Sequence, residues 1–201
     1  MKHLILSAMV LLLGLSACEQ DQSLPILGNH DIDGRDTTYH RIPDFSFVNQ
    51  DSNEVTNETF AGKAYIVDFF FTSCPTICPK VKKNMLRLYD KYEDEEQLAF
   101  LSHTIDVKRD TVGRLKTYAE NLGVSADKWH FVTGEKDEIY TIAEDYMSLA
   151  LEDPNAPGGF NHSGWLILVD NKRHIRSFCD GTDPKAVDKF TKDIDWLLSH
   201  M

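Results

Sequence analysis

Hydrophobic positions along the chain change their spacing repeatedly between residues 42 and 199. The nearly continuous apolar run over residues 65–71 is typical of a central strand that is covered on both faces. Apolar runs and alternation together predict strands over residues 44–48, 54–56, 63–71, 97–105, 129–132, 165–169 and 174–179. Apolar residues spaced three and four apart predict helices over residues 80–92, 111–121, 139–146 and 184–198.

The order of these elements predicts one three-layer α/β domain. An N-terminal β-hairpin comes first, and strands and helices then alternate, as they do around a parallel sheet with right-handed crossovers. Asp170-Asn171-Lys172-Arg173 supplies the turn of a second, late hairpin. This order fits a thioredoxin-like fold with insertions.

The N-terminus has the features of a bacterial lipoprotein signal. A basic start and a short apolar run from Leu4 to Leu15 precede small residues and Cys18. We therefore expect a signal peptide at 1–17, a lipid on Cys18, a polar flexible tether over 18–41 and a folded domain over 42–201. The alternative is an ordinary signal peptide in which Cys18 is incidental.

Charge limits the kinds of partner. The chain has 21 Lys and Arg against 32 Asp and Glu, a formal net charge of -11. Such a surface does not favour nucleic acid or anionic lipid headgroups, so membrane attachment must come from acyl chains on Cys18. We expect a monomer in the bacterial cell envelope, because the N-terminal signal directs export.

Cys74 and Cys78 are the residues with the clearest chemistry. They follow a predicted buried strand and precede a helix, whose N-terminal dipole favours thiolate over thiol. In an exported protein such a pair is a dithiol, a disulfide or a pair of metal ligands. Two thiolates suit copper(I) or zinc, but a structural zinc site needs a fourth protein ligand, and no second Cys pair or spaced His pair is present.

Four segments resemble the Sco/SenC family of copper chaperones. Residues 68–79 (D-F-F-F-T-S-C-P-T-I-C-P) resemble its Phe-rich strand followed by C-P-x-x-C-P. The other three are residues 104–111, similar to S-x-D-P-x-R-D-T, residues 129–134, similar to W-x-F-L-T-G, and residues 161–163, similar to D-H-S.

The resemblance implies that Cys74, Cys78 and His162 ligate one copper ion, as Cu(I) or Cu(II). It implies a thioredoxin-like fold in which an inserted or late β-hairpin carries the histidine. It also implies delivery of copper to the dinuclear copper centre of cytochrome c oxidase, with a copper-accepting oxidase subunit as the partner. Asn161 stands where the family usually has Asp, and Val107 stands where it usually has Pro.

Two other functions stay open at this stage. A thiol-disulfide oxidoreductase acting on the apo-oxidase subunit, or a thiol peroxidase, would use the same Cys74 and Cys78, although three intervening residues depart from the C-x-x-C of thioredoxins. A structural disulfide is the third reading, but so small a loop restrains the unfolded chain little.

His103 and Cys179 are candidate accessory residues. His103 ends a predicted central strand, at the sheet edge where thioredoxin-like sites form, but a structural role is the simpler reading. A tight turn at Asn171-Lys172 would make residue 164 face Cys179, close to His162. Cys179 could then be an accessory ligand or resolving thiol, or else a small buried hydrophobe.

Overall fold

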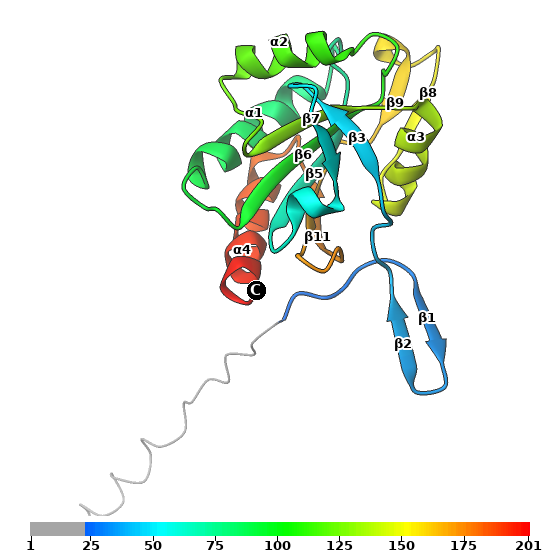
Figure 1. The fold of residues 1–201 in the computed structure, drawn as a ribbon, viewed down its shortest axis with the longest axis vertical. Coiled ribbons are helices and arrows are strands. Elements are labelled where there is room, and N and C mark those ends of the chain that lie inside the picture. Colours follow the sequence, from blue (N-terminus) through cyan, green and yellow to red (C-terminus); the bar gives the residue numbers. More distant parts are fainter. Residues whose placement is uncertain (1–22) are drawn as a thin grey trace, which may run out of the picture.

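A seven-stranded mixed sheet runs through the centre of the protein (Figure 1), as described for residues 23–201 by a computed structural model. Its strand order is β11-β10-β5-β6-β7-β3-β4, in which β5, β6 and β7 are parallel and the outer strands antiparallel. The bounds are β3 (Ser46–Asn49), β4 (Glu54–Thr56), β5 (Ala64–Phe70), β6 (Leu98–Thr104), β7 (Trp129–Thr133), β10 (Trp165–Val169) and β11 (Ile175–Asp180).

Helices cover the sheet on both faces. Three of them, α1 (Cys78–Lys91), α2 (Val112–Leu122) and α4 (Pro184–Ser199), share one face. Tyr118 of α2 packs on Phe70 and Phe131, and Tyr92 at the end of α1 donates a hydrogen bond to Asp195 of α4 at 2.6 Å. Helix α3 (Lys136–Asp145) lies on the other face. The predicted three-layer, thioredoxin-like class is confirmed.

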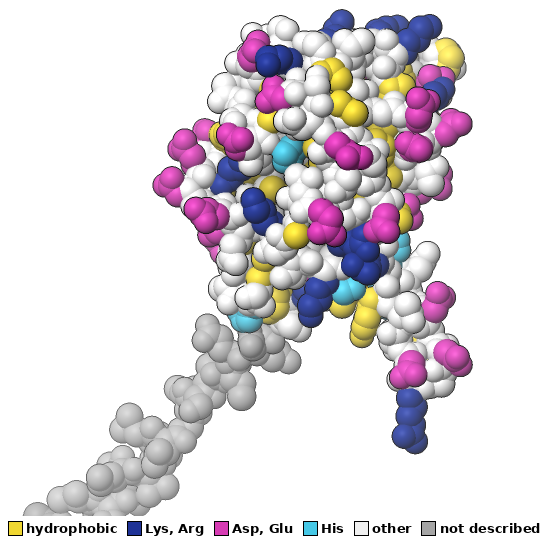
Figure 2. All heavy atoms as spheres, viewed as in Figure 1, with side chains coloured by type: hydrophobic (Ala, Val, Ile, Leu, Met, Phe, Trp, Pro, Cys, Tyr) yellow, Lys and Arg dark blue, Asp and Glu magenta, His cyan; other side chains and the backbone are white. Residues whose placement is uncertain are grey.

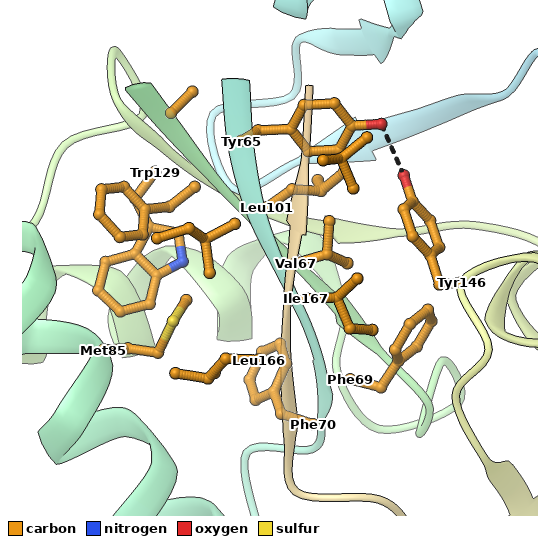
Figure 3. Close-up of a cluster of buried hydrophobic side chains, with 14 of the residues drawn as sticks. Tyr65, Val67, Phe69, Phe70, Met85, Leu101, Trp129, Tyr146, Leu166 and Ile167 are labelled. Atoms are coloured by element: carbon orange, nitrogen blue, oxygen red, sulfur yellow. Dashed lines mark hydrogen bonds between the residues drawn. The ribbon is translucent and has the colours of Figure 1, made fainter. Parts of the chain in front are cut away.

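Two apolar layers meet on strand β5, every residue of which is buried. Figure 3 shows Phe70, Met85, Leu166 and Trp129 on one side of this strand and Val67, Phe69, Ile167 and Tyr146 on the other. The hydroxyls of Tyr65 and Tyr146 lie 3.2 Å apart. The continuous apolar run therefore has the double-sided cover that it predicted. None of the helices in residues 23–201 is long and apolar enough to cross a bilayer.

The segment expected to be a structureless tether contains a hairpin. Strands β1 (His30–Asp33) and β2 (Asp36–Tyr39) pair with each other, and all of their side chains are exposed. The hairpin projects from the body of the molecule (Figure 1). On either side of it the chain is held to the sheet, because Leu27 N–H donates to Ile175 and Ile42 N–H to Arg173. The predicted signal peptide and Cys18 lie outside the described residues.

A second small hairpin carries His162. Strand β8 (Ala150–Glu152) pairs with β9 (Phe160–His162), and the chain between them includes a short 3-10 helix, η2 (Pro157–Gly159). A similar turn, η1 (Asn57–Phe60), follows β4. The histidine thus lies on a hairpin just before β10, whereas the late hairpin predicted around residues 170–173 is β10–β11. Strands β8 and β9 were not predicted.

The register of β10 and β11 differs from the predicted one by two residues. Cys179 faces Leu166 rather than residue 164. The turn is longer than expected because Arg173 has a φ of 70° and the Asp170 N–H donates to the His174 carbonyl, which leaves a bulge beside Val169. A type I turn followed by a left-handed residue produces this kind of offset.

Candidate metal centre

The segment between β5 and α1 that carries Cys74, here called the cysteine loop, lies at the carboxyl edge of the parallel strands. β5 ends at Phe70, and Cys74 and Cys78 follow within eight residues, where thioredoxin-like and other α/β folds place their sites. Cys78 is the first residue of α1 and Pro79 occupies the first turn, where a missing N–H costs no hydrogen bond. Cys74 lies in the preceding loop, so only one of the two sulfurs belongs to the helix.

Asp110 holds the loop before Cys74 in place. Its buried carboxylate accepts hydrogen bonds from the Thr72 N–H at 2.9 Å and hydroxyl at 2.5 Å, and from the Thr104 hydroxyl at 2.6 Å. The Arg114 guanidinium donates to the Thr72 hydroxyl at 2.7 Å from the outside. Asp110 belongs to the motif at residues 104–111, and the structure gives that motif a role: it ties the start of the cysteine loop to the end of β6.

A glycine contact brings the loop before His162 onto the cysteine loop. Gly158 has a φ of +81°, and a Cβ added to it would lie 2.7 Å from the Phe71 ring and 3.3 Å from Pro75. The Phe71 ring also contacts Phe160 and His162, at centroid distances of 5.0 and 5.6 Å. Only glycine fits this approach without strain. Phe71 is therefore the support on which the β8–β9 hairpin rests.

Cys74, Cys78 and His162 come together around one point. The His162 Nε2 atom lies 3.8 Å from the Cys74 Sγ and 3.4 Å from the Cys78 Sγ, and the three ligand atoms are within 4.8 Å of one another. The Nδ1–H of His162 donates to the Ser163 carbonyl at 3.1 Å, which turns the Nε2 atom toward the sulfurs.

This geometry fits one metal ion. A metal about 2.3 Å from sulfur and about 2.0 Å from nitrogen, at tetrahedral to trigonal angles, separates the two ligand atoms by roughly 3.5–3.7 Å. The sulfur–nitrogen distances of 3.4 and 3.8 Å lie on either side of that range. Within residues 23–201 no fourth His, Cys, Asp or Glu joins the group. Two thiolates and one imidazole favour copper over a closed structural zinc site.

The two cysteines differ electrostatically. Burial opposes ionisation of Cys74, but hydrogen bonds from His162 and from the Thr76 and Cys78 backbones outweigh it and lower the pKa of Cys74 to about 6. Burial raises the pKa of Cys78 well above its usual value, and the charge on Cys74 adds to that rise. Cys74 is thus the thiolate of the pair at neutral pH, and Cys78 its protonated neighbour.

The two candidate accessory residues lie outside this group. Cys179 is buried on β11, and burial raises its pKa to about 12, so it behaves as a small apolar side chain. His103 is fully buried among aromatic rings, and burial lowers its pKa to about 3. Its ring stacks on Phe69 at 5.0 Å. These surroundings favour a structural role for both residues.

Sequence reasoning missed one polar group beside the centre. Lys82, four residues after Cys78 on α1, forms a buried ion pair with Asp68 of β5, with a nitrogen–oxygen distance of 2.7 Å. Two features of the sequence could have revealed this pair: an Asp inside an apolar strand, and a Lys on the inward face of a helix. Of the sequence departures, Asn161 is exposed on β9 next to His162, and Val107 packs against the core.

The surface is acidic, as the composition indicates. Figure 2 shows Asp and Glu side chains spread over this face, with Lys and Arg between them and no continuous basic area. A surface of this sign does not favour nucleic acid.

Comparisons with known proteins agree with the motifs. A family model described as SCO1/SenC matches residues 34–199. A SCO1/SenC family lipoprotein from Bacillus anthracis superposes with a TM-score of 0.71, at 25% identity over 78% of this chain and 94% of its own.

Two further structures are similar. BsSco, described as a member of the Sco family of cytochrome c oxidase assembly proteins and as having a disulfide switch, has a TM-score of 0.70 and 27% identity, covering 81% of this chain and 95% of its own. Copper-bound yeast Sco1 has a TM-score of 0.62 and 25% identity, covering 76% and 87%. Together with the family match, these similarities show that the chain belongs to the SCO1/SenC family.

Proposed function

We propose that this protein binds one copper ion through Cys74, Cys78 and His162 and delivers it to the dinuclear copper centre of cytochrome c oxidase. The observation that carries the proposal is the position of His162 Nε2, at 3.4 and 3.8 Å from the two sulfurs. A disulfide pair needs no third donor at that position, whereas an imidazole there completes a three-ligand site for copper. Copper in the yeast relative and the assembly role named for BsSco support the same reading.

The proposal includes attachment to a membrane from outside the cytoplasm. Residues 1–17 would be removed as a signal peptide, Cys18 would carry the lipid, and residues 18–41 would link it to the domain. Support comes from the small residues before Cys18 and from the lipoprotein of Bacillus anthracis. Mass spectrometry of the mature N-terminus in a Cys18→Ser variant and the parent chain tests this part.

Copper stoichiometry tests the ligand set. We expect about one copper per chain in the parent protein and loss of that copper in His162→Ala, Cys74→Ala and Cys78→Ala, measured by metal analysis after dialysis. His30→Ala is the matched control, because His30 is exposed on the projecting hairpin. Full copper loading of a folded His162→Ala variant would contradict the proposal.

A specific observation keeps thiol-disulfide exchange as a second candidate. A thiolate at Cys74 beside a protonated Cys78 is the asymmetry that a nucleophilic and a resolving cysteine need. The natural substrate would be a disulfide of the apo-oxidase subunit or of another envelope protein.

pH separates the two candidates. His162 lowers the pKa of Cys74, so His162→Ala should slow exchange at pH 7 and leave it nearly normal above pH 9, where the thiol ionises without help. Copper binding lost through removal of a ligand should not return at high pH. In the parent protein, the alkylation rate of Cys74 should rise with pH through a midpoint of about 6.

A further inference from the structure

Lys82 places a buried positive charge beneath the cysteine pair. It lies four residues after Cys78 on α1, so the two side chains project from the same face of the helix, one turn apart. Its side chain is only 3% exposed. A charge that is so fully removed from water acts on its neighbours with little screening.

Hydrogen bonds fix the ammonium group in one position. Lys82 Nζ donates to both carboxylate oxygens of Asp68, at 2.8 and 2.7 Å, and to the Ser102 hydroxyl at 2.8 Å. These three bonds use every donor of the ammonium. Ser102 in turn donates to Asp68 at 2.5 Å and accepts from the Trp129 indole at 2.9 Å.

Aromatic rings enclose the same ammonium. The Nζ atom lies 4.2 Å from the centroid of the Phe70 ring and 5.2 to 5.3 Å from those of Phe131 and Trp129. Ring faces stabilise a cation and exclude water. The arrangement therefore holds the Lys82 ammonium in an apolar layer beside the first turns of α1.

We propose that Lys82 is a positioning residue whose buried charge biases the centre toward its more negatively charged states. When the Cys74–Cys78 disulfide accepts two electrons from a dithiol reductant, the S–S bond breaks, Cys74 becomes a thiolate and Cys78 takes one proton. The uncharged disulfide thus becomes a pair with one negative charge, which a nearby cation stabilises.

The same reasoning applies to a bound copper ion. Two thiolates, a neutral imidazole and Cu(I) carry one net negative charge, whereas the same ligands with Cu(II) are neutral. Lys82 therefore favours Cu(I), which is gained by transfer of one electron to Cu(II). This half of the inference rests on the copper binding proposed above, and the disulfide half does not.

The negative charge of Asp68 weakens this effect but does not reverse it. The ammonium lies on the helix that begins with Cys78, whereas Asp68 lies on β5. The Cys78 sulfur thus experiences the positive end of the pair.

The test compares Lys82→Met/Asp68→Asn with the parent chain. Changing both residues leaves no unpaired buried charge, so the fold should survive. Full-length protein is equilibrated with reduced and oxidised dithiothreitol at pH 7, and free thiols are trapped by alkylation. We expect the equilibrium constant for reduction to fall about tenfold. In copper-loaded protein, the Cu(II)/Cu(I) potential should fall as well.

Arg176→Met is the matched control. Arg176 pairs with Asp170 at 2.9 Å, both side chains are mostly buried, and the pair lies at β11, away from the cysteine loop. It should lower stability without moving the thiol equilibrium. A folded double variant whose equilibrium constant equals that of the parent would overturn the proposal.

Asp68→Asn alone provides the opposite test. It keeps the cation and removes its counter-charge, so the equilibrium should shift toward the dithiol; no shift, or a shift toward the disulfide, contradicts the proposal. If the parent chain binds no copper, the proposed function fails, and the thiol equilibrium still decides the role of Lys82.

Discussion

Strand β6 presents two neighbouring residues, Ser102 and His103, to opposite faces of the sheet, and their surroundings differ completely. Ser102 faces α1 and joins a network in which Lys82, Asp68 and Trp129 all find partners. His103 faces the other way into a cage of rings, and neither of its ring nitrogens has a hydrogen-bond partner in the described part of the chain.

The difference shows how one sheet separates charge from apolar packing. The α1 face keeps a charged pair because every donor and acceptor is satisfied, and a buried charge is tolerated only under that condition. The opposite face keeps an imidazole only because it stays neutral, with a pKa lowered to about 3 by burial. The charged pair thus lies on the face where α1 begins, whereas His103 on the other face stays neutral.

Breaking the network should have the largest effect on stability. Asp68→Ala leaves the Lys82 ammonium buried without its counter-charge, which costs about 3–5 kcal/mol in comparable cases. Urea denaturation measures the loss. Asp188→Ala is the control, because it removes an ion pair with Arg87 whose side chains are 60% and 46% exposed, and such pairs contribute about 0–1 kcal/mol. Equal losses of stability in the two variants would show that the buried ion pair contributes no more than the exposed one.

Burial of neutral His103 should make the protein less stable in acid. The folded pKa of His103, about 3, lies below the usual value of 6.5, so the unfolded chain binds a proton that the folded chain refuses. Stability that is complete above pH 6.5 is therefore lost as the pH falls toward 3, at up to about 1.4 kcal/mol per pH unit. His103→Leu should lack this part of the loss, about 2 kcal/mol at pH 5. Parallel stability curves for the two proteins would show that His103 is charged in the folded state.

Cys179 extends the comparison to a third buried side chain. It packs on the α4 side of the sheet without a polar role, so Cys179→Ala should cost about 1 kcal/mol through lost contacts. Copper stoichiometry should stay the same, which metal analysis beside the Cys78→Ala variant would establish. A reduced copper content in the Cys179 variant would make this residue an accessory ligand after all.

Replacing His103 at neutral pH should have the smallest effect. Leucine has a similar volume and no unpaired nitrogen, so we expect His103→Leu to change stability by less than about 1 kcal/mol. Copper binding should not change, because the histidine is remote from the Cys74, Cys78 and His162 group. A loss of copper in this variant would show that His103 takes part in the metal centre.

Long apolar patterns made most of the fold predictable. The strands and helices of the main sheet were expected within a few residues because burial on two faces leaves an unbroken apolar run. Strands β1 and β2 left no such signal, since their side chains are all exposed. Strands β8 and β9 have three residues each, too few to show a period. Backbone pairing forms β1 and β2, whereas β8 and β9 also pack on Phe71 through Phe160 and His162.

The candidate site was predictable in part. Cys74 and Cys78 were evident from their position after a buried strand. His162 is 88 residues from Cys74, and only the resemblance to a family joined them. The register that would have brought Cys179 close failed because Arg173 adopts a left-handed conformation that the sequence does not specify. Lys82 was overlooked because a lysine on a helix is usually solvated, and only its pairing with Asp68 explains its burial.

The Gly158 contact with Phe71 has a consequence for the order of folding. The cysteine loop belongs to the first half of the domain, and the hairpin that closes on it belongs to the second, so a folding chain exposes both thiols before His162 reaches them. Oxidation of the thiols therefore competes with completion of the centre, and a newly made molecule needs either a reductant or rapid closure of the β8–β9 hairpin to remain able to accept metal.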